Sequence, residues 1–200
     1  MKNRFTLQII FAVIFLFIFE SSFATHLVGG YFTYTRLNNN KYHIKLTLYR
    51  DCNSLAFFDG DINNSDIPFA SFGIFEVTDT STVLVDSLYL SAPAVTPTPI
   101  FSNIINPFAV IPPGFCMEEG VYEADIFPPD GDKSYMIVYQ RCCRNNAITN
   151  LTNPGDQGTT YSIILPPYNS VLNSSPQFKS YPPLFICSNM PLLYDHSATD

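Results

Sequence analysis

The sequence predicts an all-β fold built from antiparallel strands. Aromatic residues make up 15% of the chain, and short alternating runs of apolar and polar residues recur between turn-forming segments. This alternation buries one side of a strand and leaves the other in water, and no stretch shows sustained helical periodicity. About seven or eight short strands at this spacing are typical of an antiparallel β-sandwich, and we expect the immunoglobulin-like kind.

The clearest hairpin spans residues 27–50. Three asparagines at positions 38–40 separate its two alternating runs, and asparagine tolerates the positive φ of a hairpin turn. The face expected to be buried carries Tyr42, Ile44, Leu46 and Leu48. The face expected to meet solvent carries His43, Lys45, Thr47 and Tyr49.

The later strands are predicted from the same alternation and from their turns. Six prolines within residues 91–114 favour an edge strand or a long crossing loop over a central strand. The turn PPDGDK, at residues 128–133, predicts a third hairpin between residues 121–127 and 134–143. The other strands are expected over residues 73–77 and 83–90, which form a second hairpin, and over residues 159–167 and 184–187.

Residues 1–24 have the organisation of a secretory signal peptide. Lys2 and Arg4 precede an apolar run over residues 5–19, and Ser22 and Ala24 provide a small-x-small cleavage site. The alternative is a membrane anchor, but the run is shorter than the roughly 20 residues that cross a bilayer. We therefore expect a secreted or cell-surface protein that meets the membrane only during export, through this peptide.

All five cysteines follow the signal peptide: Cys52, Cys116, Cys142, Cys143 and Cys187. An oxidising compartment favours disulfides, and only the adjacent pair has a close spacing, which disfavours zinc. If Phe127 faces Ser134 across the third hairpin, Cys116 lies within diagonal reach of Cys143. Cys142 would then pair with Cys52 and leave Cys187 over, although other arrangements stay open.

Several polar or aromatic groups are candidates for metal, catalytic or ligand-binding sites. Residues 59–65 place oxygen side chains at alternating positions, but the glycine and glutamate of a calcium loop are missing, which favours a solvated turn. Glu123 and Asp125 share one strand face, a spacing compatible with the two carboxylates of a glycosidase. Exposed strand carboxylates are common in acidic secreted domains, which favours a plain solvated face. Tyr49 lies on an outward face, where it is able to stack on a sugar or a protein, although most tyrosines are expected in the core.

Several motifs carry a resemblance. They are THLVGG at residues 25–30, LYRDC at 48–52, GVYEA at 120–124, YQRCCRNN at 139–146, NSSP at 173–176 and DHSATD at 195–200. Together they resemble the N-terminal region of very large secreted surface proteins of gliding Bacteroidetes. Such proteins typically continue into PKD or other immunoglobulin-like repeats and end in a gliding-motility-associated, type IX secretion sorting domain.

The resemblance implies an extracellular structural or adhesive module that is not an enzyme, so no catalytic residue is assigned. A β-sandwich domain is expected over residues 25–172, and the start of a truncated cadherin-like or PKD-like β domain over residues 173–200. There the resemblance implies calcium at Asp195 and Asp200, and no other cofactor is expected. The alternative function is a carbohydrate-binding or carbohydrate-active domain on the same scaffold.

The charge of the chain bears on its partners. Charged residues make up 14% of the sequence and the formal net charge is −7, so a nucleic-acid partner held by a basic patch is not expected. An extracellular glycan or a surface protein is the expected partner.

Overall fold

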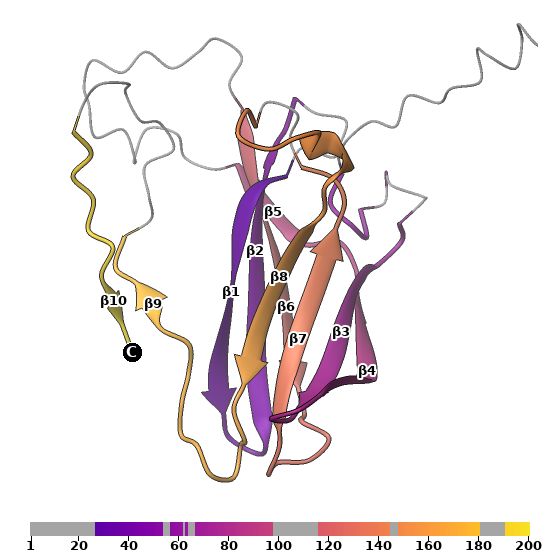
Figure 1. The fold of residues 1–200 in the computed structure, drawn as a ribbon, viewed down its shortest axis with the longest axis vertical. Coiled ribbons are helices and arrows are strands. Elements are labelled where there is room, and N and C mark those ends of the chain that lie inside the picture. The colour runs from indigo at the N-terminus through magenta and orange to yellow at the C-terminus, as the bar shows by residue number, and fades with distance from the viewer. Residues whose placement is uncertain are drawn as a thin grey trace, which may run out of the picture.

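The computed structural model describes residues 27–53, 57–61, 63, 67–97, 116–144, 148–180 and 191–200. Within them the chain forms two antiparallel sheets of four strands that pack face to face (Figure 1). The signal peptide predicted at residues 1–24 and the strand predicted at 184–187 lie outside the described residues. In the described part, no helix has the length and apolarity that a membrane crossing requires.

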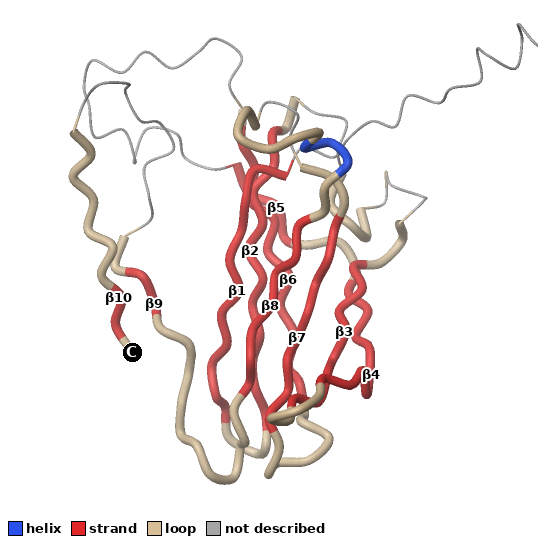
Figure 2. Tube along the Cα trace, viewed as in Figure 1, coloured by secondary structure: helices blue, strands red, loops and turns tan. Residues whose placement is uncertain are grey.

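The first sheet has the strand order β1-β2-β6-β5, and the second has the order β4-β3-β7-β8. Their bounds are β1 Leu27–Leu37, β2 Lys41–Asp51, β3 Ala70–Val77, β4 Thr82–Leu90, β5 Ala94–Pro97, β6 Met117–Ile126, β7 Ser134–Arg141 and β8 Thr159–Leu165. The two short strands β9 Gln177–Phe178 and β10 Ala198–Thr199 pair with each other. A 3₁₀ turn at Pro154–Asp156 is the one helical segment that Figure 2 shows in the described chain.

These strand orders are those of an immunoglobulin-like sandwich, with an additional strand beside the C, F and G strands of the second sheet. A further likeness lies at the corner between β6 and β7, where the Tyr135 hydroxyl accepts a hydrogen bond from the Asp130 amide at 3.0 Å. A tyrosine at this corner, bonded to backbone a few residues upstream, recurs in such folds. The predicted fold class is therefore confirmed.

Both hairpins predicted before residue 91 are confirmed. β1 and β2 pair directly, and Asn39 and Asn40 adopt φ values of 63° and 57° in the turn between them. β3 and β4 form the second hairpin. β5, in the proline-rich segment, pairs only with β6 and lies at the edge of its sheet, as expected for the part of that segment that the structure describes.

The third predicted hairpin is wrong. β6 pairs with β2 and β5, whereas β7 pairs with β3 and β8, so the turn at residues 128–133 crosses from one sheet to the other. Its Pro-Asp-Gly chemistry reverses the chain in either case, because a local turn does not specify which sheet the next strand joins.

Aromatic side chains fill the centre of the core. The rings of Phe72 on β3, Tyr122 on β6 and Tyr139 on β7 contact one another, with centroid distances of 6.0 Å, 5.1 Å and 6.1 Å. The predicted inward face of β2 is confirmed, because Tyr42, Ile44, Leu46 and Leu48 are at most 1% exposed. Thr47 is buried as well, although it alternates with that face and was expected to meet solvent.

Candidate functional site

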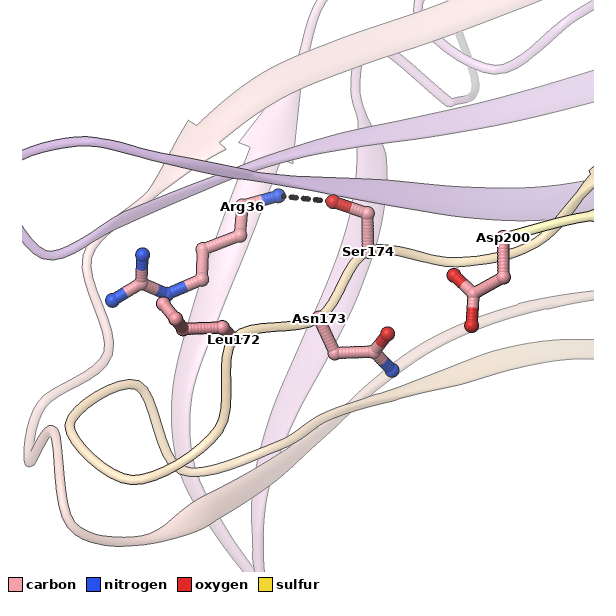
Figure 3. A pocket seen from close by; sticks show the side chains of 5 residues that line it. All are labelled: Arg36, Leu172, Asn173, Ser174 and Asp200. Carbon is pink, nitrogen blue, oxygen red and sulfur yellow. Dashed lines mark hydrogen bonds between the residues drawn. The ribbon is translucent and has the colours of Figure 1, made fainter.

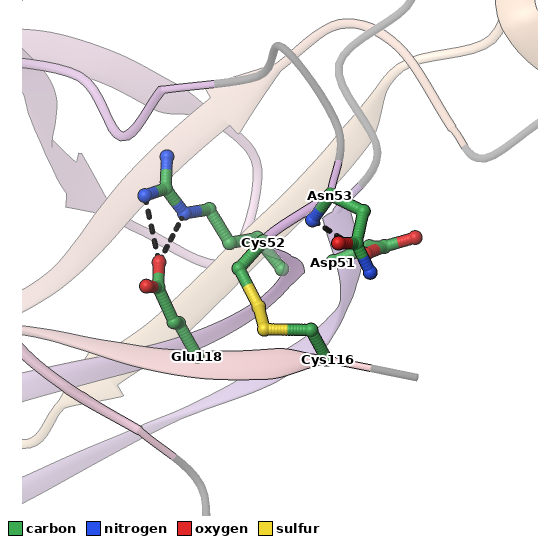
Figure 4. Close-up of a disulfide and its surroundings, with 6 residues drawn as sticks. Asp51, Cys52, Asn53, Cys116 and Glu118 are labelled. Carbon is green, nitrogen blue, oxygen red and sulfur yellow. Dashed lines mark hydrogen bonds and ion pairs between the residues drawn. A yellow bond between two sulfur atoms is a disulfide. The ribbon is translucent and has the colours of Figure 1, made fainter. Parts of the chain in front are cut away.

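The ends of three strands meet at one end of the sandwich, which we call the cysteine-rich end. β2 ends there at Asp51, β6 begins at Met117 and β7 ends at Arg141. The register pairs Asp51 with Met117, so the next residue outward on each chain is a cysteine. Cys52 and Cys116 accordingly form a disulfide with a Cα–Cα distance of 5.4 Å (Figure 4).

An ion pair supports this disulfide from the same two strands. The Arg50 guanidinium on β2 contacts Glu118 on β6, with its Nε donating to Oε2 at 2.8 Å. The Arg50 guanidinium also lies 4.7 Å from the centre of the Phe58 ring, within the range of a cation–π contact. The LYRDC motif thus ties β2 to the start of β6.

The predicted cysteine pairing is wrong. Cys116 pairs with Cys52 and not with Cys143, and Cys142 pairs with its neighbour Cys143 and not with Cys52. The prediction assumed that β6 and β7 are adjacent, whereas the strand beside β6 at this end is β2. β7 ends at Arg141, so strand alternation no longer separates the next two side chains. Cys187 lies outside the described residues.

A buried ion pair closes the core just inside the disulfides. The Asp59 carboxylate lies in the loop between β2 and β3, and its Oδ1 is 2.7 Å from Nη1 of Arg141. Its Oδ2 accepts a hydrogen bond from the Tyr139 hydroxyl at 2.7 Å. The Tyr122 hydroxyl donates to the Asp59 carbonyl at 2.8 Å, and Arg141 Nη2 donates to the Phe57 carbonyl.

This network raises the pKa of two phenols. Burial raises the pKa of Tyr122 and of Tyr139 well above the ordinary value, and the nearby Asp59 charge adds to the effect. Both phenols therefore stay protonated and act as hydrogen-bond donors. The arrangement holds the loop at residues 57–60 between strands of both sheets, because β6 supplies Tyr122 and β7 supplies Tyr139 and Arg141.

The solvated turn expected at residues 59–65 is thus wrong for Asp59, which is buried. A signal for this pair exists in the sequence. Arg141 continues the alternation of the inward residues Tyr135, Ile137 and Tyr139 on β7, so it stands at an inward position. A charged residue at such a position needs a buried counter-charge.

A second constellation joins the segment that follows β8 to the outer edge of β1. The Ser175 amide donates to the Tyr34 carbonyl at 2.9 Å, and the Tyr34 amide donates to Ser175 Oγ at 2.9 Å. One residue earlier, Ser174 Oγ accepts from the Arg36 amide at 3.1 Å (Figure 3). Asn173 donates to the Tyr34 hydroxyl at 3.1 Å. We call residues 173–175 the strap.

The strap borders an open pocket of about 520 Å³, which Arg36, Leu172, Asn173, Ser174 and Asp200 line. The Arg36 guanidinium lies 3.8 Å from the centre of the Tyr168 ring, and its Nη2 donates to the Tyr168 carbonyl at 3.1 Å. Asp200 lies across the pocket from Arg36 (Figure 3). The pocket is formed where the strap meets β1, and its lining combines charged and polar side chains with the apolar side chain of Leu172.

The predicted calcium ligands do not gather in the described part of the chain. Asp195 accepts a hydrogen bond from the Ser197 amide at 2.8 Å, and the Ser197 contacts lower the pKa of Asp195. Asp200 lines the pocket beside the strap. Among the described residues, no three His, Cys, Asp or Glu side chains are grouped so as to hold a metal ion. Calcium at this place stays a prediction.

The two sheets differ on their outer faces. On the first sheet, Asp125 contacts Lys41 and His43 at 2.9 Å each, and Lys45 lies 3.4 Å from Glu123. The predicted polar face of β2 is confirmed for His43 and Lys45, and the carboxylates of β6 serve as their partners. Farther along this face, Tyr31 and the half-buried Tyr49 lie with ring centroids 6.5 Å apart.

The outer face of the second sheet carries an apolar row. Phe75 pairs with Leu84 on one side and with Met136 on the other, and Met136 pairs with Ile164. Leu84 and Ile164 are 55% and 54% exposed. Each of the four strands thus contributes one large apolar side chain, and the four form a row that crosses the sheet perpendicular to the strands.

The chain matches no protein-family model, and comparisons with curated proteins and with solved structures found no significant similarity.

Proposed function

We propose that this chain is a structural or adhesive module of an extracellular surface protein. The observation that carries the proposal is the strap, which bonds the segment after the sandwich to the edge of β1. A flexible linker would leave that edge open, whereas here Ser175 is buried and its hydroxyl bonds both backbone groups of Tyr34. Such a junction holds the following segment in a set direction, as a module in a row of modules requires.

The same contacts occupy backbone groups at the outer edge of β1. An unpaired edge strand presents amides and carbonyls that pair readily with other chains. The strap occupies the outward groups of Tyr34 and the amide of Arg36, and the Tyr168 hydroxyl donates to the Leu37 carbonyl at 2.7 Å. The edge of β1 over residues 34–37 is therefore closed to the addition of another strand. This suits a protein that meets other proteins outside the cell.

The apolar row is the surface that we assign to adhesion, with a protein surface as its partner. Large aliphatic side chains desolvate well against another protein, whereas a glycan needs aromatic platforms flanked by hydrogen-bonding groups. Disulfide formation supports the extracellular setting, because the two described disulfides need an oxidising compartment.

The second candidate function is carbohydrate binding, and one observation favours it. Tyr31 and Tyr49 lie together on the outer face of the first sheet, and the register places Glu119 beside Tyr49. Adjacent tyrosines with a carboxylate nearby are able to stack on a sugar and accept its hydroxyl protons.

The structural part is tested by amide hydrogen exchange of the mature chain. We expect slow exchange at the Tyr34 and Arg36 amides, and faster exchange at both in the Ser174→Ala/Ser175→Ala double variant. Ser170→Ala, in the exposed turn before the strap, serves as the control. Fast exchange at both amides in the unaltered chain would remove the observation on which the proposal rests.

The adhesive part is tested with beads that carry the mature chain, applied to a surface coated with extracellular protein of the producing cells. We expect attachment that protease treatment of the surface removes and that Leu84→Ser/Ile164→Ser abolishes. Val83→Ser, 56% exposed on the same strand but outside the row, is the matched control. Binding on a glycan array that Tyr31→Ala/Tyr49→Ala removes would favour the carbohydrate function instead.

A further inference from the structure

The disulfide between the adjacent residues Cys142 and Cys143 differs from Cys52–Cys116 in what it does for the fold. Cys52–Cys116 joins residues 64 positions apart, so it removes much conformational freedom from the unfolded chain. Cys142–Cys143 joins neighbours, closes no loop of chain and removes almost none. Stabilisation of the sandwich therefore does not explain the second bond.

The backbone beside Cys142–Cys143 is held by contacts that do not involve sulfur. Arg141 is fixed by its ion pair with Asp59. The Arg144 amide donates to the Pro154 and Gln157 carbonyls at 3.2 Å and 2.9 Å, and its Nε donates to the Gly158 carbonyl at 3.2 Å. The backbone of Arg144 also forms an isolated parallel β-bridge with Leu27 at the start of β1. The S–S bond is therefore able to open while these residues keep their places.

The two residues of this pair differ in solvent exposure. Cys142 is exposed, whereas Cys143 is half-buried, as are Cys52 and Cys116. Exchange with an outside thiol requires that the attacking sulfur reach one sulfur in line with the S–S bond, so we infer that the sulfur of the more exposed residue, Cys142, is attacked first.

We propose that Cys142–Cys143 is a thiol–disulfide exchange site that takes a cysteine thiolate from another molecule. The thiolate attacks Sγ of Cys142, the S–S bond breaks, and its electron pair leaves on Sγ of Cys143, which takes a proton from water. The product is a mixed disulfide on Cys142 and a thiol at Cys143. One disulfide is exchanged for another, so no outside oxidant is consumed. This proposal is independent of the adhesive function.

The test uses the mature chain with Cys187→Ser, so that the four paired cysteines are the only ones present. The folded protein is incubated with reduced glutathione at neutral pH, quenched with acid, alkylated and mapped by peptide mass spectrometry. We expect glutathione on Cys142, the alkyl group on Cys143 and an intact Cys52–Cys116 bond. The exchange should be at least about tenfold faster than opening of Cys52–Cys116, with an unchanged circular dichroism spectrum.

The control is Cys142→Ser/Cys143→Ser, which should take up no glutathione while it keeps the Cys52–Cys116 bond. Mapping of the unaltered protein decides the matter even if this variant folds poorly. The proposal is overturned if Cys52 or Cys116 reacts first, if glutathione is found on Cys143 alone, or if Cys142 reacts only after unfolding in urea. It is equally overturned if mapping without reductant finds Cys142 bonded to any residue other than Cys143.

Discussion

The two ends of the sandwich hold their charged side chains in opposite ways. At the cysteine-rich end, the side chains of Arg141 and Asp59 are only 4% and 8% exposed. The Tyr139 hydroxyl donates to the Asp59 carboxylate, and the Arg141 guanidinium donates to the Phe57 carbonyl. The opposite end carries the turns at residues 38–40 and 128–133, and we call it the turn end. There Asp125 contacts Lys41 and His43 at similar distances, but all three side chains are about one third exposed. The contact distances are similar at the two ends, but the charged groups are buried at one end and exposed to water at the other.

Burial decides how much each contact matters. A charge in the core has lost its hydration, so removal of its partner leaves it uncompensated and strongly destabilises the fold. A charge at the turn end regains water when its partner is lost, and the loss is small. We therefore expect the cysteine-rich end to determine stability, and the turn end to tolerate change.

The largest effect is expected for Asp59→Ala. The variant leaves the Arg141 guanidinium buried without a counter-charge, which should lower the free energy of unfolding by about 3–5 kcal/mol. Urea denaturation followed by circular dichroism measures it, with Asp125→Ala as the matched control at the turn end. Asp59→Ala/Arg141→Met should recover part of the loss, because it removes both charges. Equal losses in the two single variants would contradict the comparison.

The next effect concerns the disulfide at the same end. Cys52→Ser/Cys116→Ser reopens a loop between residues 64 positions apart and should cost about 4 kcal/mol through the entropy of the unfolded chain. Cys142→Ser/Cys143→Ser, measured in the same urea titration, should leave the midpoint nearly in place. A larger shift in the second variant than in the first would show that the adjacent pair stabilises the fold after all.

The sequence was sufficient where local signals decide the structure. The asparagines at 38–40 fix the first hairpin, and the alternation of Tyr42, Ile44, Leu46 and Leu48 identifies the buried face of β2. It was insufficient where distant segments meet. The turn at residues 128–133 has the same sequence pattern whether the chain returns within a sheet or crosses between sheets. The wrong cysteine pairing followed from the assumption that β6 and β7 pair in one sheet.

The buried ion pair was missed for a related reason. Asp59 lies in a segment rich in Asp and Asn, which by composition is typical of a solvated turn. Its partner Tyr139 is 80 residues away, and no local pattern reports such a distance. Sequence patterns therefore recovered most strands of the two four-stranded sheets, and the contacts between the sheets became visible only in three dimensions.

A steric change at the cysteine-rich end gives an intermediate effect. A Cβ atom at Gly120 would lie 2.7 Å from two atoms of the Phe58 ring, which is fully buried. Gly120→Ala should therefore overpack this end and cost about 1–3 kcal/mol in the free energy of unfolding. Gly29→Ala is the matched control, because nothing lies within 4 Å of its Cβ position. Equal thermal midpoints for the two variants would contradict the packing argument.

The smallest effect is expected at the turn end, and it depends on pH. Hydrogen bonds from His43 and Lys41 lower the pKa of Asp125 below its ordinary value of 3.8. The unfolded chain then binds a proton at this carboxyl more readily than the folded chain does. The stability that Asp125 contributes is therefore present above its ordinary pKa and is lost as the pH falls through the lower pKa of the folded state.

Asp125→Asn should flatten the acid side of the stability curve below about pH 4, since the amide does not titrate. Urea midpoints between about pH 2 and pH 7 measure this. Lys41→Gln should reproduce part of the change, because it removes one of the two donors that hold the carboxylate. If Asp125→Asn steepened the acid limb or left it unchanged, this exposed cluster would not act through the charge of Asp125.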